Sequence, residues 1–230
     1  MRIAIIPARG GSKRIPRKNI KDFFEKPIIA YSIENALKSD LFDEVFVSTD
    51  DQEIAAIAMK YGAKVPVLRS EENSNDFATT SDVLLEVINY YTTKNQTIES
   101  ILCLYPTAPL INEKDIISSH EIWKTGKFDV LLSSVAFDFA VQRGFKISEG
   151  NFIELMNPEA IHMRSQDLET IYHDAGIFYW LKFESFIKNQ TIWAGNIGTF
   201  PLNQMYVQDI DTIEDWEIAK IKYEYIQSAK

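Results

Sequence analysis

The chain has 230 residues, 46% of them hydrophobic and 25% charged, which is the composition of an ordinary globular protein. Its formal net charge of −9 at pH 7 argues against a nucleic acid or an anionic membrane as its partner. No apolar run approaches the roughly 18 to 20 residues that span a bilayer. A single cysteine, Cys103, excludes an internal disulfide and is typical of a reducing compartment, so we expect a cytoplasmic protein. The length of the chain predicts one domain over residues 1–230.

Apolar runs bounded by turn residues predict strands that alternate with helices. The expected strands are residues 3–6, 44–49, 64–68, 100–105, 129–135, 176–181 and 205–208. The expected helices are residues 27–39, 52–61, 83–91, 112–124 and a last one that Thr212 and Asp215 open as a capping box. This alternation predicts an α/β fold, a mainly parallel Rossmann-like sheet with helices on both faces.

The alternation stops after residue 135. Residues 143–148 and 151–156, joined by Glu149 and Gly150, predict a β-hairpin, and an irregular stretch follows it up to Tyr172. We therefore expect residues 136–172 to be a small hairpin insertion that lies on the domain or reaches across to a second subunit. A homodimer is the corresponding prediction.

Three polar loops follow predicted strands, at residues 9–18, 69–80 and 106–109. In open α/β sheets, ligands bind at the carboxyl ends of the strands, where the strand order reverses. We expect the three loops to meet at that edge.

The first of these loops has the features of an anion site. Gly10 and Gly11 lack side chains that would keep backbone N–H groups away from an anion. Seven cationic residues precede the first carboxylate, Asp22: Arg2, Arg9, Lys13, Arg14, Arg17, Lys18 and Lys21. In an acidic protein this cluster indicates a polyphosphate ligand, and the alternative is a solvated basic turn. The spacing fits neither G-x-x-x-x-G-K-[ST] nor G-x-G-x-x-G.

A pair of acids near the C-terminus complements that loop. Asp209 and Asp211 are two residues apart at the end of an expected strand, where residues i and i+2 point the same way. Two carboxylates on one side suit Mg²⁺, which takes its other ligands from water and phosphate. The alternative makes Asp211 a helix-flanking residue and Asp209 a surface acid. A cationic loop and a bound cation at one sheet edge together indicate nucleotidyl transfer.

The stretch A-R-G-G-S-K-R-I-P-R-K-N and the residues around the two acids resemble the CMP-sialic acid synthetase-like cytidylyltransferases. The resemblance extends over nearly the whole chain. It implies transfer of CMP from CTP to the anomeric hydroxyl of a nonulosonic acid, with Mg²⁺ as cofactor and pyrophosphate as leaving group. The product would serve the glycosylation of surface glycans or flagellin.

The resemblance also implies roles for individual residues. Lys18, Asp211 and Arg9 become the catalytic residues, and Asp209 and Asp211 the metal ligands. Asp211 or a metal-bound water would accept the hydroxyl proton, and the sequence leaves both open. The residues implied to bind the nucleotide are Ala8, Arg9, Gly10, Gly11, Ser12, Lys13, Lys18, Asn19, Arg69 and Thr80.

Residues 164–168, 172–176 and 207–212 resemble the pseudaminic acid branch of the family. The implied sugar-binding residues are Tyr105, Arg164, Gln166, His173 and Asp174. Arg164 is a candidate bidentate clamp for the sugar carboxylate, and the alternative is an arginine on a flexible insertion without a ligand. His173 either contacts the sugar or packs in the core.

Other functions stay open at this point. Legionaminic and N-acetylneuraminic acid are the alternative acceptors, although Tyr105 and Ile111 depart from the sialic acid branch. The octulosonate branch carries an aspartate after its central strand, and Tyr105-Pro106-Thr107 offers none. A uridylyl- or guanylyltransferase, or a non-catalytic nucleotide-binding domain of the same fold, are the remaining possibilities.

Overall fold

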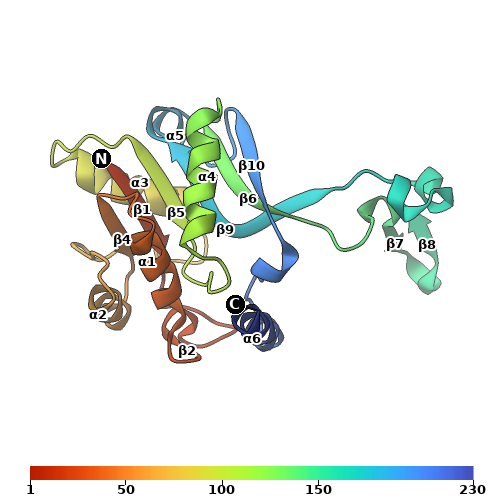
Figure 1. Cartoon of the computed structure of the whole chain (residues 1–230), viewed down its shortest axis with the longest axis horizontal. Coiled ribbons are helices and arrows are strands. Elements are labelled where there is room, and N and C mark those ends of the chain that lie inside the picture. Colours follow the sequence, from red (N-terminus) through yellow and green to blue (C-terminus); the bar gives the residue numbers. More distant parts are fainter. Residues whose placement is uncertain (230) are drawn as a thin grey trace.

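The protein is described here by a computed structural model covering residues 1–229, and within these residues a mixed sheet of six strands forms the centre of the fold (Figure 1). The strand order is β10-β6-β9-β5-β1-β4. In chain order these strands are β1 (Arg2–Pro7), β4 (Glu44–Ser48), β5 (Ser100–Leu104), β6 (Val130–Ala136), β9 (Tyr172–Lys182) and β10 (Ile197–Leu202). β1 pairs in parallel with β4 and β5, and β10 with β6, whereas β9 is antiparallel to both of its neighbours. The predicted mainly parallel α/β fold is confirmed.

Helices cover both faces of this sheet, as predicted. They are α1 (Ile28–Lys38), α2 (Gln52–Lys60), α3 (Thr80–Thr92), α4 (Glu113–Thr125), α5 (Phe183–Asn189) and α6 (Ile213–Ser228). Alternate residues of β1 enter two separate clusters, because successive side chains of a strand point to opposite faces. Ala4 and Ile6 pack in the cluster that includes residues of α1, α2 and α4, while Ile3 and Ile5 join residues of α3 and α5. In the described residues, no helix is long and apolar enough to cross a membrane.

The strand order reverses at β1. From β1 the chain passes through α1 to β4 on one side, and then through α2 and α3 to β5 on the other side of β1. The loops that leave β1 and β5 therefore diverge at their carboxyl ends, which opens a crevice for a ligand at this edge.

Two of the predicted strands are wrong. In residues 64–68 only Lys64 bridges to the sheet, opposite Phe46, because Pro66 has no N–H to continue the ladder. Residues 204–206 form the 3-10 turn η6 (Gln204–Tyr206), capped by the side chain of Asn203. The last strand is β10, which lies earlier in the chain.

Reciprocal caps mark the starts of three helices: α4 and α6 begin where predicted, whereas α3 begins at Thr80 and not at residue 83. The Thr79 hydroxyl and Asp82 cap α3, and Asn112 and Asp115 cap α4 in the same way. Thr212 and Asp215 form the predicted capping box of α6. Each cap satisfies backbone N–H groups that a helix start leaves without partners.

Between β6 and β9 the chain leaves the body of the domain and forms a projecting arm, residues 137–171 (Figure 1). The arm contains the predicted hairpin, with narrower bounds: β7 (Phe145–Ile147) and β8 (Ile153–Leu155) pair antiparallel. Four 3-10 turns complete it: η2 (Val141–Arg143), η3 (Glu149–Asn151), η4 (Pro158–His162) and η5 (Ser165–Asp167). The description of residues 1–230 as one domain with an insertion at 136–172 stays a prediction.

An aromatic cluster joins the N-terminal region to the last helix. After η1 (Lys18–Ile20), the short strands β2 (Asp22–Phe23) and β3 (Lys26–Pro27) place Phe23 beneath α6. Its ring centroid lies 5.4 to 5.7 Å from those of Tyr31, Trp216 and Tyr223, in edge-to-face geometry. Such pairs add stabilisation beyond area burial, so this contact holds α6 and the residues before it against the first loop.

We predict that Phe23→Ala lowers the free energy of unfolding by about 3–5 kcal/mol, as expected for removal of a fully buried ring. Phe77→Ala is the matched control, since Phe77 is 92% exposed whereas Phe23 is 0% exposed. Urea unfolding followed by tryptophan fluorescence measures both. Equal losses in the two variants would show that the cluster does not hold the helix.

Candidate active site

The three predicted loops lie together around one cavity of about 510 Å³. The loop after β1 contributes Arg9, Ser12 and Lys18, and the polar loop after β4 and α2 contributes Arg69, residues 73, 75 and 76, and residues 78–80. Tyr105, Pro106 and Thr107 follow β5, and Asp211 comes from the segment before α6. The prediction that these loops converge on one sheet edge is confirmed.

The cationic loop and the C-terminal acids are in direct contact. The Lys18 Nζ lies 3.5 Å from Asp211 Oδ1 and donates a hydrogen bond to the carbonyl of Ile210. The Arg14 Nη2 lies 2.8 Å from Asp211 Oδ2. Residues almost 200 positions apart thus form one charged site. The phosphates of a triphosphate–metal complex would contact its cations, and the metal ion would contact its acids.

The loop is held in shape by acids at the end of β4. The N–H of Gly10 donates to Asp50 Oδ1 at 2.8 Å, and a Cβ at position 10 would lie 2.9 Å from Asp51 Oδ2. This close approach requires glycine, whereas Gly11 faces open space. Arg17, at a φ of 57°, forms ion pairs with Asp51 and Glu53. The loop is therefore clamped onto the start of α2.

Two predicted nucleotide-binding cations are paired with an acid that sequence reasoning missed. Asp76 accepts from Arg9 Nη1 at 2.9 Å and from Lys13 Nζ at 2.5 Å. Lys13 first, and Arg9 second, hold the pKa of this carboxyl below its usual value. No sequence signal distinguishes Asp76 from Glu71 and Glu72 in the same polar loop.

The inner wall of the cavity holds the other predicted nucleotide residues. Arg69 is buried and donates to Ser48 Oγ at 3.0 Å and to the Ser48 carbonyl. Burial lowers its pKa to about 10. The Thr80 hydroxyl lies 3.0 Å from the Tyr105 hydroxyl, and the buried Asn19 side chain donates to the Arg9 carbonyl at 2.9 Å.

A second cavity, of about 1100 Å³, adjoins the first. Tyr105 lines both cavities. Asp211 lines the first, smaller cavity, and Asp209 lines the larger one. The acid pair therefore stands where the two cavities meet, which is the place where a group would pass from one bound ligand to another.

Two predicted sugar-binding residues, His173 and Asp174, line the larger cavity. Asp174 accepts from the Gly176 N–H at 2.9 Å and from the Tyr179 hydroxyl. His173 is exposed, and its ring lies 4.5 Å from that of Phe137. The alternative that His173 packs in the core is wrong.

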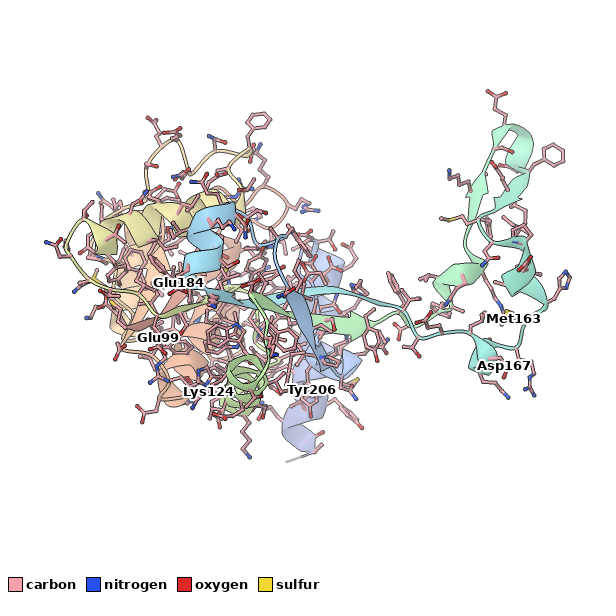
Figure 2. The ribbon with its side chains drawn as sticks, turned by 90° about the horizontal axis from the view of Figure 1, so that it is seen from above. Glu99, Lys124, Met163, Asp167, Glu184 and Tyr206 are labelled. Atoms are coloured by element: carbon pink, nitrogen blue, oxygen red, sulfur yellow. The ribbon has the colours of Figure 1, made fainter. Side chains whose placement is uncertain are left out.

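Arg164 and Gln166 lie on the arm and line neither cavity. The Arg164 side chain is 72% exposed and pairs with Asp167 in the same turn. Figure 2 shows Met163 and Asp167, on either side of Arg164 in sequence, far out on the arm. Within one chain these two residues do not join the site, and their sugar-binding roles stay predictions.

The residues that line the larger cavity and were not predicted include two cations and a buried tyrosine. Arg143 comes from the arm, Tyr179 from β9 and Lys222 from α6. Each of these residues lies outside any recognisable motif, so the sequence offered no reason to select it.

The acid pair fits a divalent cation held partly by other groups. Burial first, and the charge of Asp211 second, raise the pKa of Asp209, so its negative charge is incompletely compensated. In residues 1–229 no group of three or more His, Cys, Asp or Glu side chains could hold a metal alone. Two carboxylates completed by phosphate and water oxygens are a donor set that suits Mg²⁺.

Comparison with known proteins defines the class. Residues 3–220 match the family described as "Cytidylyltransferase", so the chain belongs to this family and is a nucleotidyltransferase. It is 43% identical to the pseudaminic acid cytidylyltransferase of Campylobacter jejuni serotype O:2 over 96% of this chain and 95% of that one.

Two further similarities are broader. The CMP-N,N'-diacetyllegionaminic acid synthase of Legionella pneumophila is 35% identical over 99% of this chain and 98% of its own. A structure of CMP:2-keto-3-deoxy-manno-octonic acid synthetase complexed with CTP superposes with a TM-score of 0.68 at 21% identity, covering 99% of each chain. The last similarity shows the fold alone.

We predict that Asp51→Asn destabilises the protein by about 1 kcal/mol at pH 7, since a partly exposed ion pair is lost while asparagine still caps α2. Arg17 lowers the pKa of Asp51 to about 2. A carboxyl with a depressed pKa contributes stability above its unfolded-state pKa of about 3.9 and loses it as the pH falls toward 2. Urea unfolding between pH 7 and pH 2.5 should show the two proteins converging below pH 4. A difference that persists unchanged to pH 2.5 would contradict this assignment.

Proposed function

We propose that the protein transfers CMP from CTP to the anomeric hydroxyl of a nonulosonic acid, with pseudaminic acid as acceptor, in the cytoplasm, for surface glycan or flagellin glycosylation. The single observation that carries this proposal is the contact of Lys18 and Arg14 with Asp211 at the junction of the two cavities. The relative from Campylobacter jejuni supports pseudaminic acid, and the legionaminic acid synthase supports the alternative acceptor.

The chemistry needs charge neutralisation and alignment more than covalent catalysis. Arg9, Lys13 and Lys18 face the cavity in which the triphosphate would lie. To bind it, Arg9 and Lys13 would exchange Asp76 for phosphate oxygens, which form stronger charge-assisted contacts. Arg69 and Thr80, deeper in the cavity, would position the cytidine.

The acceptor would occupy the larger cavity. Its anomeric oxygen would form a bond to the α-phosphorus as the bond from that phosphorus to the pyrophosphate oxygen breaks. The hydroxyl proton would pass to Asp211 or to water, and pyrophosphate would leave. Mg²⁺ held by Asp209 and Asp211 would neutralise charge on the phosphates and favour the leaving group.

The decisive experiment mixes the protein with CTP, Mg²⁺ and pseudaminic, legionaminic or N-acetylneuraminic acid, and measures pyrophosphate release. We expect pseudaminic acid to give the highest kcat/KM, and UTP or GTP to give no turnover. Asp211→Asn is expected to abolish turnover while the circular dichroism spectrum stays unchanged, because it removes a charge and keeps the shape.

Turnover by Asp211→Asn at the normal rate would remove this acid from the site. If none of the three acids gives pyrophosphate release, the proposed function is overturned and a non-catalytic nucleotide-binding domain is favoured.

We also propose that the arm mediates a homodimer by packing against a second copy of this chain. Large apolar side chains are exposed along it, including Phe139 (87%), Phe152 (74%), Ile147 (71%) and Met156 (68%). An isolated two-stranded hairpin is marginally stable in water, so a projecting hairpin of this composition needs a partner surface. The arm's continuity with the larger cavity through Arg143 would place the partner beside the acceptor site.

Light scattering at micromolar concentration should give the mass of a dimer. Phe152→Asp, on the exposed hairpin, should shift the protein toward monomer, because a charge would be buried in the interface. A monomeric unmodified protein would refute the dimer.

A further inference from the structure

Lys222 is a cation of the larger cavity that the mechanism above does not use. It comes from α6 and is half-buried. Its Nζ donates to the carbonyls of Gln204 at 3.0 Å and Val207 at 2.6 Å. An ammonium group has three N–H donors, so one remains after these two hydrogen bonds.

The charge of Lys222 is only partly compensated. Burial lowers the pKa of its ammonium, and Asp138 opposes this effect at longer range. Within residues 1–229 Lys222 forms no ion pair, and its two hydrogen-bond partners are neutral carbonyls. A half-buried cation in this state is stabilised by an anion that enters the cavity.

The other cationic groups of this cavity are less suited to that anion. The guanidinium of Arg143 donates to Ser165 Oγ at 3.1 Å and to the carbonyls of Ala160 and Met163, all within the arm. Arg164 does not line the cavity and pairs with Asp167. Lys222 is held by the body of the domain and lies near Asp209, since its Nζ donates to the carbonyl of Val207, two residues before that acid.

The chemistry of the acceptor gives this position its meaning. In a 2-ulosonic acid the carboxylate is attached to the anomeric carbon, the same carbon that carries the attacking hydroxyl. When that hydroxyl lies at the junction beside Asp209 and Asp211, the carboxylate must also lie next to these acids. There it would be repelled unless a cation from the adjacent wall compensates it.

We propose that Lys222 binds the carboxylate of the acceptor sugar and thereby selects acidic sugars and orients the anomeric hydroxyl toward the nucleotide. This inference rests on the proposed function. Through its hydrogen bonds to residues 204 and 207, the same side chain also fastens α6 to the turn that precedes Asp209.

The test compares Lys222→Met and Lys222→Arg in the full-length protein, with pseudaminic acid and its uncharged C1 methyl ester as ligands. We expect Lys222→Met to raise the KM for the acid about tenfold or more, as for loss of a charge-assisted hydrogen bond, and the KM for CTP less than about twofold. The inhibition constant of the ester should change little, and Lys222→Arg should retain most of the affinity for the acid. Lys220→Met is the matched control, since Lys220 lies on the same helix, pairs with Glu217 and lines neither cavity.

Three results would overturn the proposal: an unchanged KM for the acid, equal losses for acid and CTP, or equal losses for acid and ester. Each would leave Lys222 as a structural fastener or as a residue without effect. If Arg164→Ala, and not Lys222→Met, produces the loss specific to the acid, the carboxylate is bound by the arm. Turnover by the unmodified protein with any of these outcomes preserves the proposed function, whereas absence of turnover removes both.

Discussion

The proposed active site depends on one electrostatic contact, between the cationic loop after β1 and Asp211 before α6. Taken separately, each segment carries like charges that repel one another. Together they place positive and negative groups side by side at one cavity, where a polyphosphate and a divalent cation would find complementary partners. The aromatic cluster around Phe23 supports this contact from below by holding α6 against the N-terminal region.

The sheet explains why the site has two compartments. The reversal of strand order at β1 opens the smaller cavity, and Tyr105, directly after β5, lines both this cavity and the larger one. β9 enters the sheet antiparallel and brings His173 and Asp174 to the wall of the larger cavity. The arm leaves the sheet from β6 and returns through β9, so it projects from the edge of that same cavity (Figure 2). The division of the site into two cavities is thus a consequence of strand order.

Much of this could be predicted from local patterns. Alternating apolar segments predicted the parallel sheet, and cap residues at Asn112 and Thr212 marked helix starts, because these signals depend on neighbours in the chain. The prediction failed at residues 205–208, where a β-like sequence forms a turn. There Asn203 caps the turn, and Lys222, distant in sequence, binds its carbonyls. Tertiary hydrogen bonds overrode the local preference.

By itself, the sequence determined the alternation of strands and helices and the clustering of cations in the loop after β1. These features are local, since they follow from side-chain period, charge and backbone sterics within a few residues. Only the tertiary structure decided that Gly10 lies against Asp51 and that Asp211 lines the smaller cavity while Asp209 lines the larger one. It alone decided that Asp76 pairs with Arg9 and Lys13, and that Arg164 stays on the arm while Lys222 lines the larger cavity. Such contacts join residues far apart in the chain, and no local pattern encodes which distant partner a charged side chain will meet.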